Sequence, residues 1–473
     1  MIVMFYGRDQ ELKKMNSLYE KGDHQLAVIY GRRRVGKTTL ISEFCKDKKT
    51  LLFPALESTT EKNLKVFSKI INEFIDPKSS VNPEYASFGD AFTKIFEAAE
   101  KERFVFVIDE YPYLAASDNS VSSVLQHLID HKFSKTNIFM IICGSSMSFM
   151  ENQVLGRNSP LYGRRTAQFR IEPLNYLKAA EAHSELSNET NAVIYGITGG
   201  IPHYINKLLI GNDNGLGDSI INDILDTSSY LFEEPANLLK QELREPATYN
   251  AIISVIAGGA TRVNDIANKT SLTQPVCSKY LSVLVSLGIV GKRSPVSDSK
   301  KNKTIYYVKD NFFRFWYRFV PDNIYQITAG NAEAVYENEI APKINDYMGL
   351  IFEDMCTQYL IRYADRLPFT IKVIGGWWGG NPETKMPEEI DLIAFSGKEA
   401  IFGECKWWTD PVGISVLKEI KRKAQLFPKF DKKYYYLFSK SGFTSEVIKE
   451  AEKDTAIRLI PLSEMYIRRD VRS

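Results

Sequence analysis

Eight residues near the N-terminus have the types and spacing of a phosphate-binding loop. The run Gly31–Thr38 reads Gly-Arg-Arg-Arg-Val-Gly-Lys-Thr, which fits the pattern G-x-x-x-x-G-K-[ST]. An apolar run of buried-strand type, residues 26–30, precedes it, and residues 39–44 continue with helical spacing. A loop between a strand and a helix start directs backbone N–H groups and the helix dipole at an anion. The pattern therefore predicts a nucleotide-binding protein.

Each part of this loop has an expected role. Lys37 can reach the β- and γ-phosphates as a catalytic residue, and the Thr38 hydroxyl can bind Mg²⁺. The expected ligands are therefore ATP and Mg²⁺. The residues predicted to contact the nucleotide are Gly31, Arg32, Arg33, Arg34, Val35, Gly36, Lys37, Thr38 and Thr39.

An acidic pair follows a second apolar run, residues 104–108. Asp109 is expected to hold the Mg²⁺ shell, and Glu110 to orient or activate the attacking water, so the pair predicts hydrolysis. The alternative is a structural Asp-Glu pair that caps a core strand. A third apolar run, residues 138–143, leads to Ser145, where a polar side chain would sense the γ-phosphate.

A second set of charged residues lies in the C-terminal part of the chain. Asp391 lies in the apolar run 389–395, and Glu404 and Lys406 lie in the run 400–408. On a strand, residues two apart face the same side, so Glu404 and Lys406 point together. Two carboxylates can hold a divalent ion while the ammonium positions or deprotonates a water for attack on phosphate. The spacing predicts a metal-dependent nuclease site with Asp391 and Glu404 as metal ligands.

Two interpretations of these C-terminal charges stay open. The first is a metal site, because unpaired charges inside core strands cost roughly several kcal/mol unless they are paired or bound to metal. Glu353, on a preceding helix, supplies a further acid for such a site. The other interpretation is a structural Asp–Lys pair at strand ends. The triplet Glu-x-Lys alone has no weight, because it also occurs at residues 11–13, 383–385 and 419–421.

Several of these segments together resemble a known family. The chain resembles archaeal-type P-loop ATPases at the border of the AAA+ and STAND classes, fused to a winged helix and a C-terminal DUF234 region with a PD-(D/E)XK nuclease-like fold. Besides the phosphate loop, the resemblance rests on residues 5–12, 108–114, 144–146, 161–164, 199–204 and 403–407. It implies that Pro202 packs a helical lid onto the nucleotide. It also implies that Arg164 or Arg165 faces a phosphate as a catalytic residue, with a solvated basic turn as the alternative.

The elements that must position these residues predict an α/β fold. We expect a P-loop NTPase parallel sheet with a helical lid, a winged helix-turn-helix and a C-terminal restriction-endonuclease-like α/β domain. A chain of 473 residues is long enough for about three domains. The expected boundaries are 1–172 for the ATPase core, 173–244 for the lid, 245–310 for the winged helix, 311–344 for a helical connector and 345–473 for the last domain.

The predicted winged helix is the candidate DNA-binding module. Residues 248–257, 262–267 and 274–287 would be its helices, and Pro275 suits the first turn of the last, the recognition helix. The basic tract 291–303 would be the wing, which could lie along phosphates. Packing against a protein partner is the alternative role.

Composition limits the partners. The chain has 60 Lys and Arg against 58 Asp and Glu, so any affinity for DNA must come from local patches. The five cysteines are scattered without a C-x-x-C pair, which favours a reducing cytoplasm and argues against a zinc site. No apolar stretch approaches the length of a membrane span. We expect a cytoplasmic protein that binds ATP and DNA and no membrane; a nucleotide-dependent homo-oligomer is also compatible.

Two functions fit the sequence. The first is an ATP-driven enzyme acting on DNA, in which the ATPase gates a metal-dependent nuclease. The second is an ATP-dependent switch that binds DNA or a protein partner, with a catalytically inactive nuclease fold.

Overall fold

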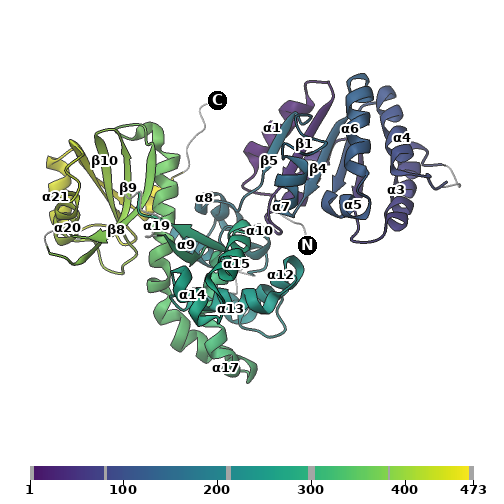
Figure 1. The fold of residues 1–473 in the computed structure, drawn as a ribbon. Helices are drawn as coiled ribbons and strands as arrows, with labels where there is room; N and C mark the ends of the chain where they lie inside the picture. The colour runs from purple at the N-terminus through teal and green to yellow at the C-terminus, as the bar shows by residue number, and fades with distance from the viewer. Residues whose placement is uncertain (1–4, 79–82, 209–214, 297–303, 382–383, 468–473) are drawn as a thin grey trace. The chain divides into compact units, whose positions relative to one another are not determined.

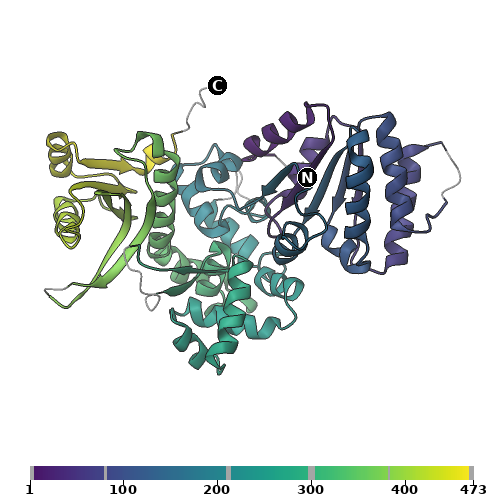
Figure 2. The same ribbon diagram turned by 45° about the horizontal axis from the view of Figure 1, so that its top comes forward.

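The chain forms two compact units in the computed structural model, which describes residues 5–78, 83–208, 215–296, 304–381 and 384–467. The first unit comprises the residues up to 174 together with residues 201–203. The second comprises residues 175–200 and the chain from residue 204 onward (Figures 1 and 2).

The first unit is built on a five-stranded sheet. Its strands lie in the order β2-β3-β4-β1-β5, and every pair is parallel. Their bounds are β1 (Gln25–Tyr30), β2 (Thr50–Pro54), β3 (Val105–Asp109), β4 (Phe139–Gly144) and β5 (Ala167–Arg170). Because the strands are parallel, the carboxyl ends of β1, β3 and β4 meet at one edge of the sheet. This edge carries the phosphate loop, Asp109, Glu110 and Ser145, whereas Arg164 precedes β5 and so lies toward the opposite edge.

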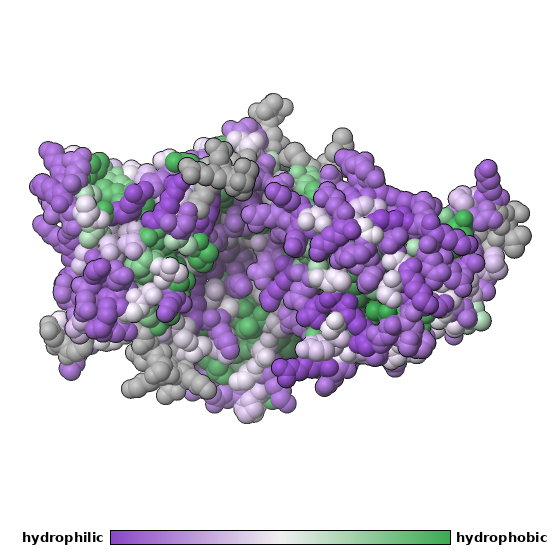
Figure 3. Space-filling model, turned by 90° about the horizontal axis from the view of Figure 1, so that it is seen from above, coloured by the Kyte–Doolittle hydropathy of each residue, from purple (hydrophilic) through white to green (hydrophobic). Residues whose placement is uncertain are grey.

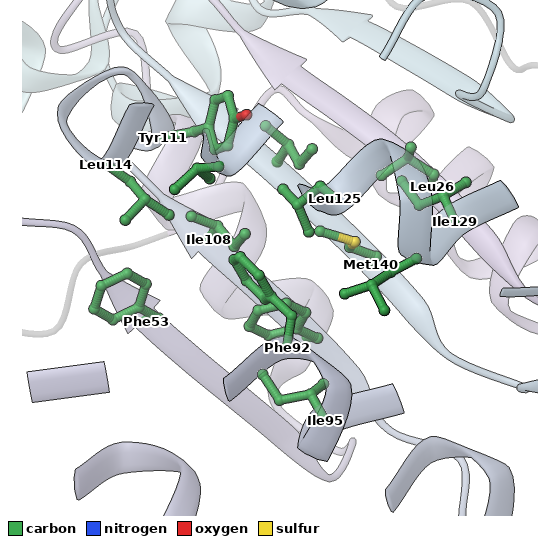
Figure 4. Packing of buried hydrophobic residues seen from close by; sticks show 14 of the residues in the cluster. Leu26, Phe53, Phe92, Ile95, Ile108, Tyr111, Leu114, Leu125, Ile129 and Met140 are labelled. Atoms are coloured by element: carbon green, nitrogen blue, oxygen red, sulfur yellow. The ribbon is translucent and has the colours of Figure 1, made fainter. Parts of the chain in front are cut away.

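Helices cover both faces of this sheet, which explains why its strands are nearly continuous apolar runs. Leu26 and Val28 pack with the helices of one face, whereas Ala27 and Ile29 pack with those of the other. Figure 4 shows the larger of the two clusters, with Phe92 and Leu125 of the covering helices against Met140 of β4. The first face carries α3 (Thr60–Ile75), α4 (Phe88–Lys101), α5 (Tyr111–Ser117) and α6 (Val121–Lys132); the second carries α1 (Asp9–Tyr19) and α2 (Lys37–Cys45).

The second unit begins with helices. They are α8 (Tyr176–Ala179), α9 (Asn188–Thr198), α11 (Leu216–Ser219) and α12 (Glu234–Glu242). The short α7 (Met147–Phe149) belongs to the first unit, and α10 (Pro202–Ile205) lies between α9 and α11 in the chain. Next come α13 (Pro246–Ala257), α14 (Val263–Lys269) and α15 (Gln274–Ser286), followed by an antiparallel pair, β6 (Val290–Arg293) and β7 (Ile305–Val308). Residues 297–303 of the predicted wing lie outside the described residues.

An aromatic helix, α16 (Asn311–Phe319), forms part of the core of this unit. Phe312, Phe313 and Phe315 are fully buried, and the Phe312 ring lies 4.6 Å from that of Tyr204. The aromatic residues therefore pack α16 against its neighbours and do not form an exposed stacking surface. After α16 come α17 (Ile324–Thr328), α18 (Ala332–Val335) and the long α19 (Ile344–Arg362).

A second five-stranded sheet ends the chain. Its order is β12-β11-β10-β9-β8; β10, β11 and β12 pair in parallel, whereas β8 and β9 are antiparallel to their neighbours. The α/β class with a separate C-terminal mixed sheet is thus confirmed. Its elements are β8 (Val373–Gly380), β9 (Pro387–Ser396), β10 (Glu399–Lys406), α20 (Ile414–Ala424), β11 (Lys432–Ser439), α21 (Ser445–Lys453), β12 (Ile457–Pro461) and α22 (Leu462–Met465).

The surface drawn in Figure 3 carries mostly hydrophilic residues, with smaller hydrophobic patches between them. Within the described ranges, no helix is both long and apolar enough to cross a membrane.

Candidate functional site

The phosphate loop joins β1 to α2, and two of its glycines are required by the backbone. Gly36 has a φ of 92°, a left-handed conformation that other residues adopt only with strain. A Cβ at Gly31 would lie 2.2 Å from the carbonyl oxygen of Ile171, so no larger residue fits there. The loop conformation is therefore fixed at both of its ends, before any phosphate binds.

Lys37 is held at the start of α2 by the loop itself. Its Nζ donates hydrogen bonds to the carbonyl oxygens of Gly31 and Arg32, both at 2.9 Å, and the side chain is buried. Burial lowers the pKa of the Lys37 ammonium. A buried ammonium that donates to neutral carbonyl oxygens is well suited to receive an anionic phosphate oxygen.

The two predicted Mg²⁺ ligands lie next to each other. Thr38, at the first turn of α2, donates from Oγ1 to Oδ2 of Asp109 at 3.5 Å. The other carboxylate oxygen of Asp109 accepts the N–H of Glu110 at 3.0 Å. A hydroxyl beside a carboxylate at the end of the loop fits a hard divalent ion.

Glu110 and Ser145, predicted separately from two strand ends, are bonded to each other. Ser145 donates from Oγ to both carboxylate oxygens of Glu110 at 2.8 Å, and its backbone N–H donates to one of them at 3.2 Å. Glu110 has a φ of 51°, a left-handed conformation that is strained for this residue type. The carboxylate is therefore held in one orientation by the end of β4.

Pro202 lies at the phosphate loop within the first unit. A Cβ at Gly36 would be 3.7 Å from Cγ of Pro202, and the backbone N–H of His203 donates to the Arg34 carbonyl at 3.4 Å. The Tyr6 hydroxyl donates to the Pro202 carbonyl at 3.5 Å. The segment that the sequence assigns to the nucleotide thus contacts the loop.

Arg8 supports the loop and was missed in the sequence. Its Nη2 donates to the carbonyl oxygens of Val35, at 3.0 Å, and of Glu172, and its Nη1 pairs with Glu11 at 3.2 Å. The side chain is only 6% exposed, and burial lowers the pKa of its guanidinium. Arginine is rarely buried so deeply, and its signal in the sequence was the segment 5–12, one of those on which the family resemblance rests.

Arg164 forms an ion pair with the carboxylate of Asp130. Its Nε and Nη2 donate to the two oxygens of Asp130 on α6, both at 2.7 Å, and its Nη1 donates to the carbonyl of Pro160 at 2.8 Å. This bidentate bond lowers the pKa of Asp130. A role for Arg164 at a phosphate would require release of Asp130, and the role stays a prediction.

The three predicted C-terminal residues are brought together by the register of β9 and β10. The Lys406 Nζ donates to Oε1 of Glu404 at 2.7 Å and to Oδ2 of Asp391 at 3.3 Å. That same oxygen of Asp391 accepts the backbone N–H of Cys405 at 2.8 Å. Asp391, Glu404 and Lys406 therefore form one largely buried cluster, here called the acid–lysine cluster.

One oxygen of this cluster has no partner. Oε2 of Glu404 is buried and accepts no hydrogen bond from the described residues, and burial followed by the charge of Asp391 raises the pKa of Glu404. A divalent ion would satisfy this oxygen. In the described ranges, no group of three or more His, Cys, Asp or Glu side chains is arranged to hold a metal ion. An ion at the acid–lysine cluster would have two carboxylates, as Mg²⁺ sites that also use water and phosphate often do.

Glu353 of α19 lies beside the cluster. Burial, reinforced by the charge of Asp391, raises the pKa of Glu353 to about 8, although Arg293 opposes this shift. Arg293 of β6 approaches Oε2 of Glu353 at 3.9 Å and pairs with Asp354 at 2.6 Å. The acid expected on this helix is present, and a residue from β6 reaches it.

The raised pKa of Glu353 predicts how stability depends on pH. Because the folded-state pKa lies above the ordinary value of 4.5, the folded state keeps a proton that the unfolded chain releases. This contribution to stability is complete below pH 4.5 and is lost as the pH rises toward 8. We expect Glu353→Gln to gain stability relative to the wild type by about 1 kcal/mol per pH unit across this window.

All five tryptophans lie in the second unit, so urea unfolding followed by tryptophan fluorescence measures this prediction. The matched control is Asp346→Asn, which removes an exposed acid from the first turn of the same helix. Parallel curves for Glu353→Gln and the wild type between pH 5 and 8 would show that Glu353 ionises as an ordinary carboxyl.

Two family models match separate parts of the chain. Residues 5–208 match the family model of an ATPase domain found predominantly in Archaea. Residues 316–423 match DUF234, a model of archaeal and bacterial proteins of unknown function.

One similar protein matches almost the whole chain, and others match parts of it. An uncharacterised protein of Methanocaldococcus jannaschii is 31% identical over 440 residues, which are 92% of this chain and 94% of that protein. An uncharacterised ATP-binding protein of the same organism is 46% identical over 48 residues, 10% of this chain and 81% of that protein. A Walker-type ATPase of Pyrococcus abyssi has a similar structure, with a TM-score of 0.50 and 19% identity, covering 66% of this chain and 96% of that one. This last likeness shows the fold.

Proposed function

Because this chain belongs to the family of archaeal-type ATPases that carry a C-terminal DUF234 region, we propose that it hydrolyses ATP and cuts DNA at a metal-dependent site that the ATPase controls. The observation that carries this proposal is the acid–lysine cluster, in which Glu404 has a buried oxygen without a partner.

At the nucleotide, the loop residues and Lys37 would hold the phosphates. Mg²⁺ held by Thr38 and Asp109 would neutralise phosphate charge. Glu110 would accept a proton from, or orient, the attacking water, and Ser145 would keep its carboxylate in place. Their bonded arrangement supports these roles, since a general base acts only when its geometry is fixed.

At the C-terminal site, Asp391 and Glu404 would hold a divalent ion, which would polarise a phosphodiester. Lys406 would orient the water that attacks the phosphorus. The helices α13 to α15 and the strands β6 and β7 have the order of a winged helix, which we propose contacts the DNA duplex. Because all five cysteines are free, we propose a reducing, cytoplasmic setting.

Control by the ATPase is supported by α19, which contacts both the helical lid and the cluster. Its Tyr347 hydroxyl bonds the carbonyl oxygens of Gly196 on α9, at 2.7 Å, and of Asn311 on α16, at 3.0 Å. A Cβ at Gly196 would lie 2.4 Å from Sδ of Met348, so the two helices are in close contact. Glu353, less than two turns further along α19, is close enough to the cluster for the charge of Asp391 to raise its pKa. A movement of α9 would therefore be transmitted along a rigid helix.

Hydrogen exchange with and without a non-hydrolysable ATP analogue tests this control. We expect the analogue to protect residues 31–38 and also to change exchange in α19 and β10. Tyr347→Phe, which removes both hydroxyl bonds, should keep the first effect and weaken the second at least about twofold. Tyr317→Phe is the matched control, because this buried hydroxyl bonds Asn250 and not α9.

The outcomes separate the parts of the proposal. Protection of residues 31–38 with no change in α19 would contradict control through this helix. An analogue that protects neither region would contradict nucleotide binding itself.

The ion pairs of Lys406 support a second candidate function, that of an ATP-dependent switch. The Lys406 ammonium bridges Asp391 and Glu404, as a purely structural pair would. On that basis the protein would be an ATP-dependent switch that binds DNA or a protein partner, with an inactive nuclease fold. A wild-type protein that binds DNA in an ATP-dependent way without cutting it would favour this alternative.

A further inference from the structure

We propose that Lys423 is a phosphate-binding residue of the C-terminal site, holding an oxygen of a nucleic-acid backbone next to the acid–lysine cluster. This inference rests on the proposed function, which assigns a phosphodiester substrate to the cluster. It adds a residue that the sequence pattern did not identify as part of the site.

The alternation of β10 directs its charged residues toward α20, the helix that carries Lys423. Phe402 packs in the core that includes Leu417 and Ile420 of α20, and Glu404 and Lys406 follow on the same face of the strand. Cys405, which lies between them, faces the opposite way, because its side chain is hydrogen-bonded to that of Cys356 on α19. The acid–lysine cluster is therefore on the side of the sheet that α20 covers.

Lys423 reaches this cluster from the last turn of α20. Its Nζ lies 3.7 Å from Oε1 of Glu404, and its side chain is only 14% exposed. The flanking Ala424 is fully buried, which fixes the end of the helix against the sheet. The ammonium is thus placed by packing and not by a flexible surface position.

The hydrogen-bonding capacity of Lys423 is unused. An ammonium has three N–H donors, and a distance of 3.7 Å is too long for a hydrogen bond. Among the described residues, its ion pair with Glu404 is the single polar contact of Nζ. The nearer ammonium, of Lys406, already occupies that carboxylate oxygen at 2.7 Å. A largely buried cation with unused donors beside two carboxylates favours an anionic ligand that brings its own oxygens.

The neighbouring cations of α20 differ in this respect. Arg422 is bonded by Glu388, at 2.8 and 2.9 Å, and by Glu419, at 2.6 and 2.8 Å. Lys421 pairs with Asp454 at 3.2 Å. The basic stretch of this helix is therefore largely paired with protein carboxylates, and Lys423 is the member that faces the cluster.

The charge of the cluster also fits a phosphodiester. Asp391 and Glu404 balance Lys406 and Lys423, so the four groups together have no formal charge. A divalent ion would add two positive charges, and a backbone phosphate would reduce that excess. Because Lys423 would contact only the phosphate, it would contribute affinity without preference for a base sequence.

The test is DNA binding by the full chain in Ca²⁺, measured with a linear duplex and a single strand over a series of salt concentrations. We expect Lys423→Gln to weaken binding roughly tenfold at 0.1 M salt and to lower the slope of log affinity against log salt by about one unit. Lys423→Arg keeps the charge and should retain the slope. Lys418→Gln is the matched control, because Lys418 lies on the exposed face of the same helix and should change neither quantity.

The outcomes distinguish this inference from the nuclease proposal. An unchanged affinity and slope in Lys423→Gln would overturn the inference and leave Lys423 as a structural partner of Glu404, whether or not the protein cuts DNA. A loss of slope in Lys423→Gln, in a protein that cuts no DNA with Mg²⁺ or Mn²⁺, would support the phosphate site while contradicting the nuclease. A lower urea midpoint of tryptophan fluorescence in Lys423→Gln, with the slope retained, would also overturn the inference.

Discussion

Glu110→Gln is expected to bind ATP as the wild type does and to hydrolyse it at least about a hundredfold more slowly. The amide has the size of the carboxylate and can still accept the hydrogen bond of Ser145, so the end of β3 should keep its conformation. It cannot accept a proton from water at neutral pH. Phosphate release and the affinity for a fluorescent ATP analogue measure the two effects separately.

Two variants control this experiment. Lys37→Ala should abolish tight nucleotide binding, because it removes the buried ammonium at the start of α2. Ser145→Ala should keep binding and lose less turnover than Glu110→Gln, since it releases the carboxylate without removing it. Wild-type turnover in Glu110→Gln would refute the catalytic role of this residue.

The nucleotide site was largely predictable because its determinants are local. The order strand, glycine loop and helix is contained in about twenty residues, and parallel strands necessarily bring the ends of β1, β3 and β4 to one edge. The acid–lysine cluster was predictable for a similar reason, because alternation on β10 places Glu404 and Lys406 on one face. The register of β9 then adds Asp391.

Contacts between distant segments could not be predicted in this way. Arg8 reaches the carbonyl of Glu172, which is 164 residues further along the chain, and no local pattern encodes that bond. The pairing of Arg164 with Asp130 likewise depends on how α6 packs. The family resemblance predicts that Arg164 or Arg165 faces a phosphate, whereas the anion that Arg164 meets in the structure is the carboxylate of Asp130.

The contact between α9 and α19 also joins distant segments and could not be predicted from a local pattern. The sequence predicted a helix that carries Glu353, whereas the close contact of Met348 with Gly196 depends on the absence of a side chain on another helix. Lys423 is a further case. Among the many cations of α20, sequence alone does not show which one faces the sheet.

Asp391→Asn and Lys406→Gln are expected to abolish DNA cleavage, by at least about a hundredfold, while ATP hydrolysis persists. The two reactions would use divalent ions at separate sites, because Asp109 and Asp391 lie in different units. Supercoiled and linear DNA with Mg²⁺, Mn²⁺ or a chelator, each with and without ATP, measures cleavage. Phosphate release from the same samples measures the ATPase.

The choice of asparagine matters because the Asp391 carboxylate also accepts the Cys405 N–H and the Lys406 ammonium. Asp391→Ala would leave the Cys405 N–H unpaired in a buried place, which costs roughly 1–3 kcal/mol, and would leave the Lys406 ammonium with Glu404 alone, so a loss of cleavage could then reflect a loss of fold. Asp391→Asn keeps an oxygen for the backbone N–H and removes the charge that a divalent ion needs. If Asp391→Asn or Lys406→Gln cuts DNA at the wild-type rate, the charges are structural, and the protein is better described as an ATP-dependent switch.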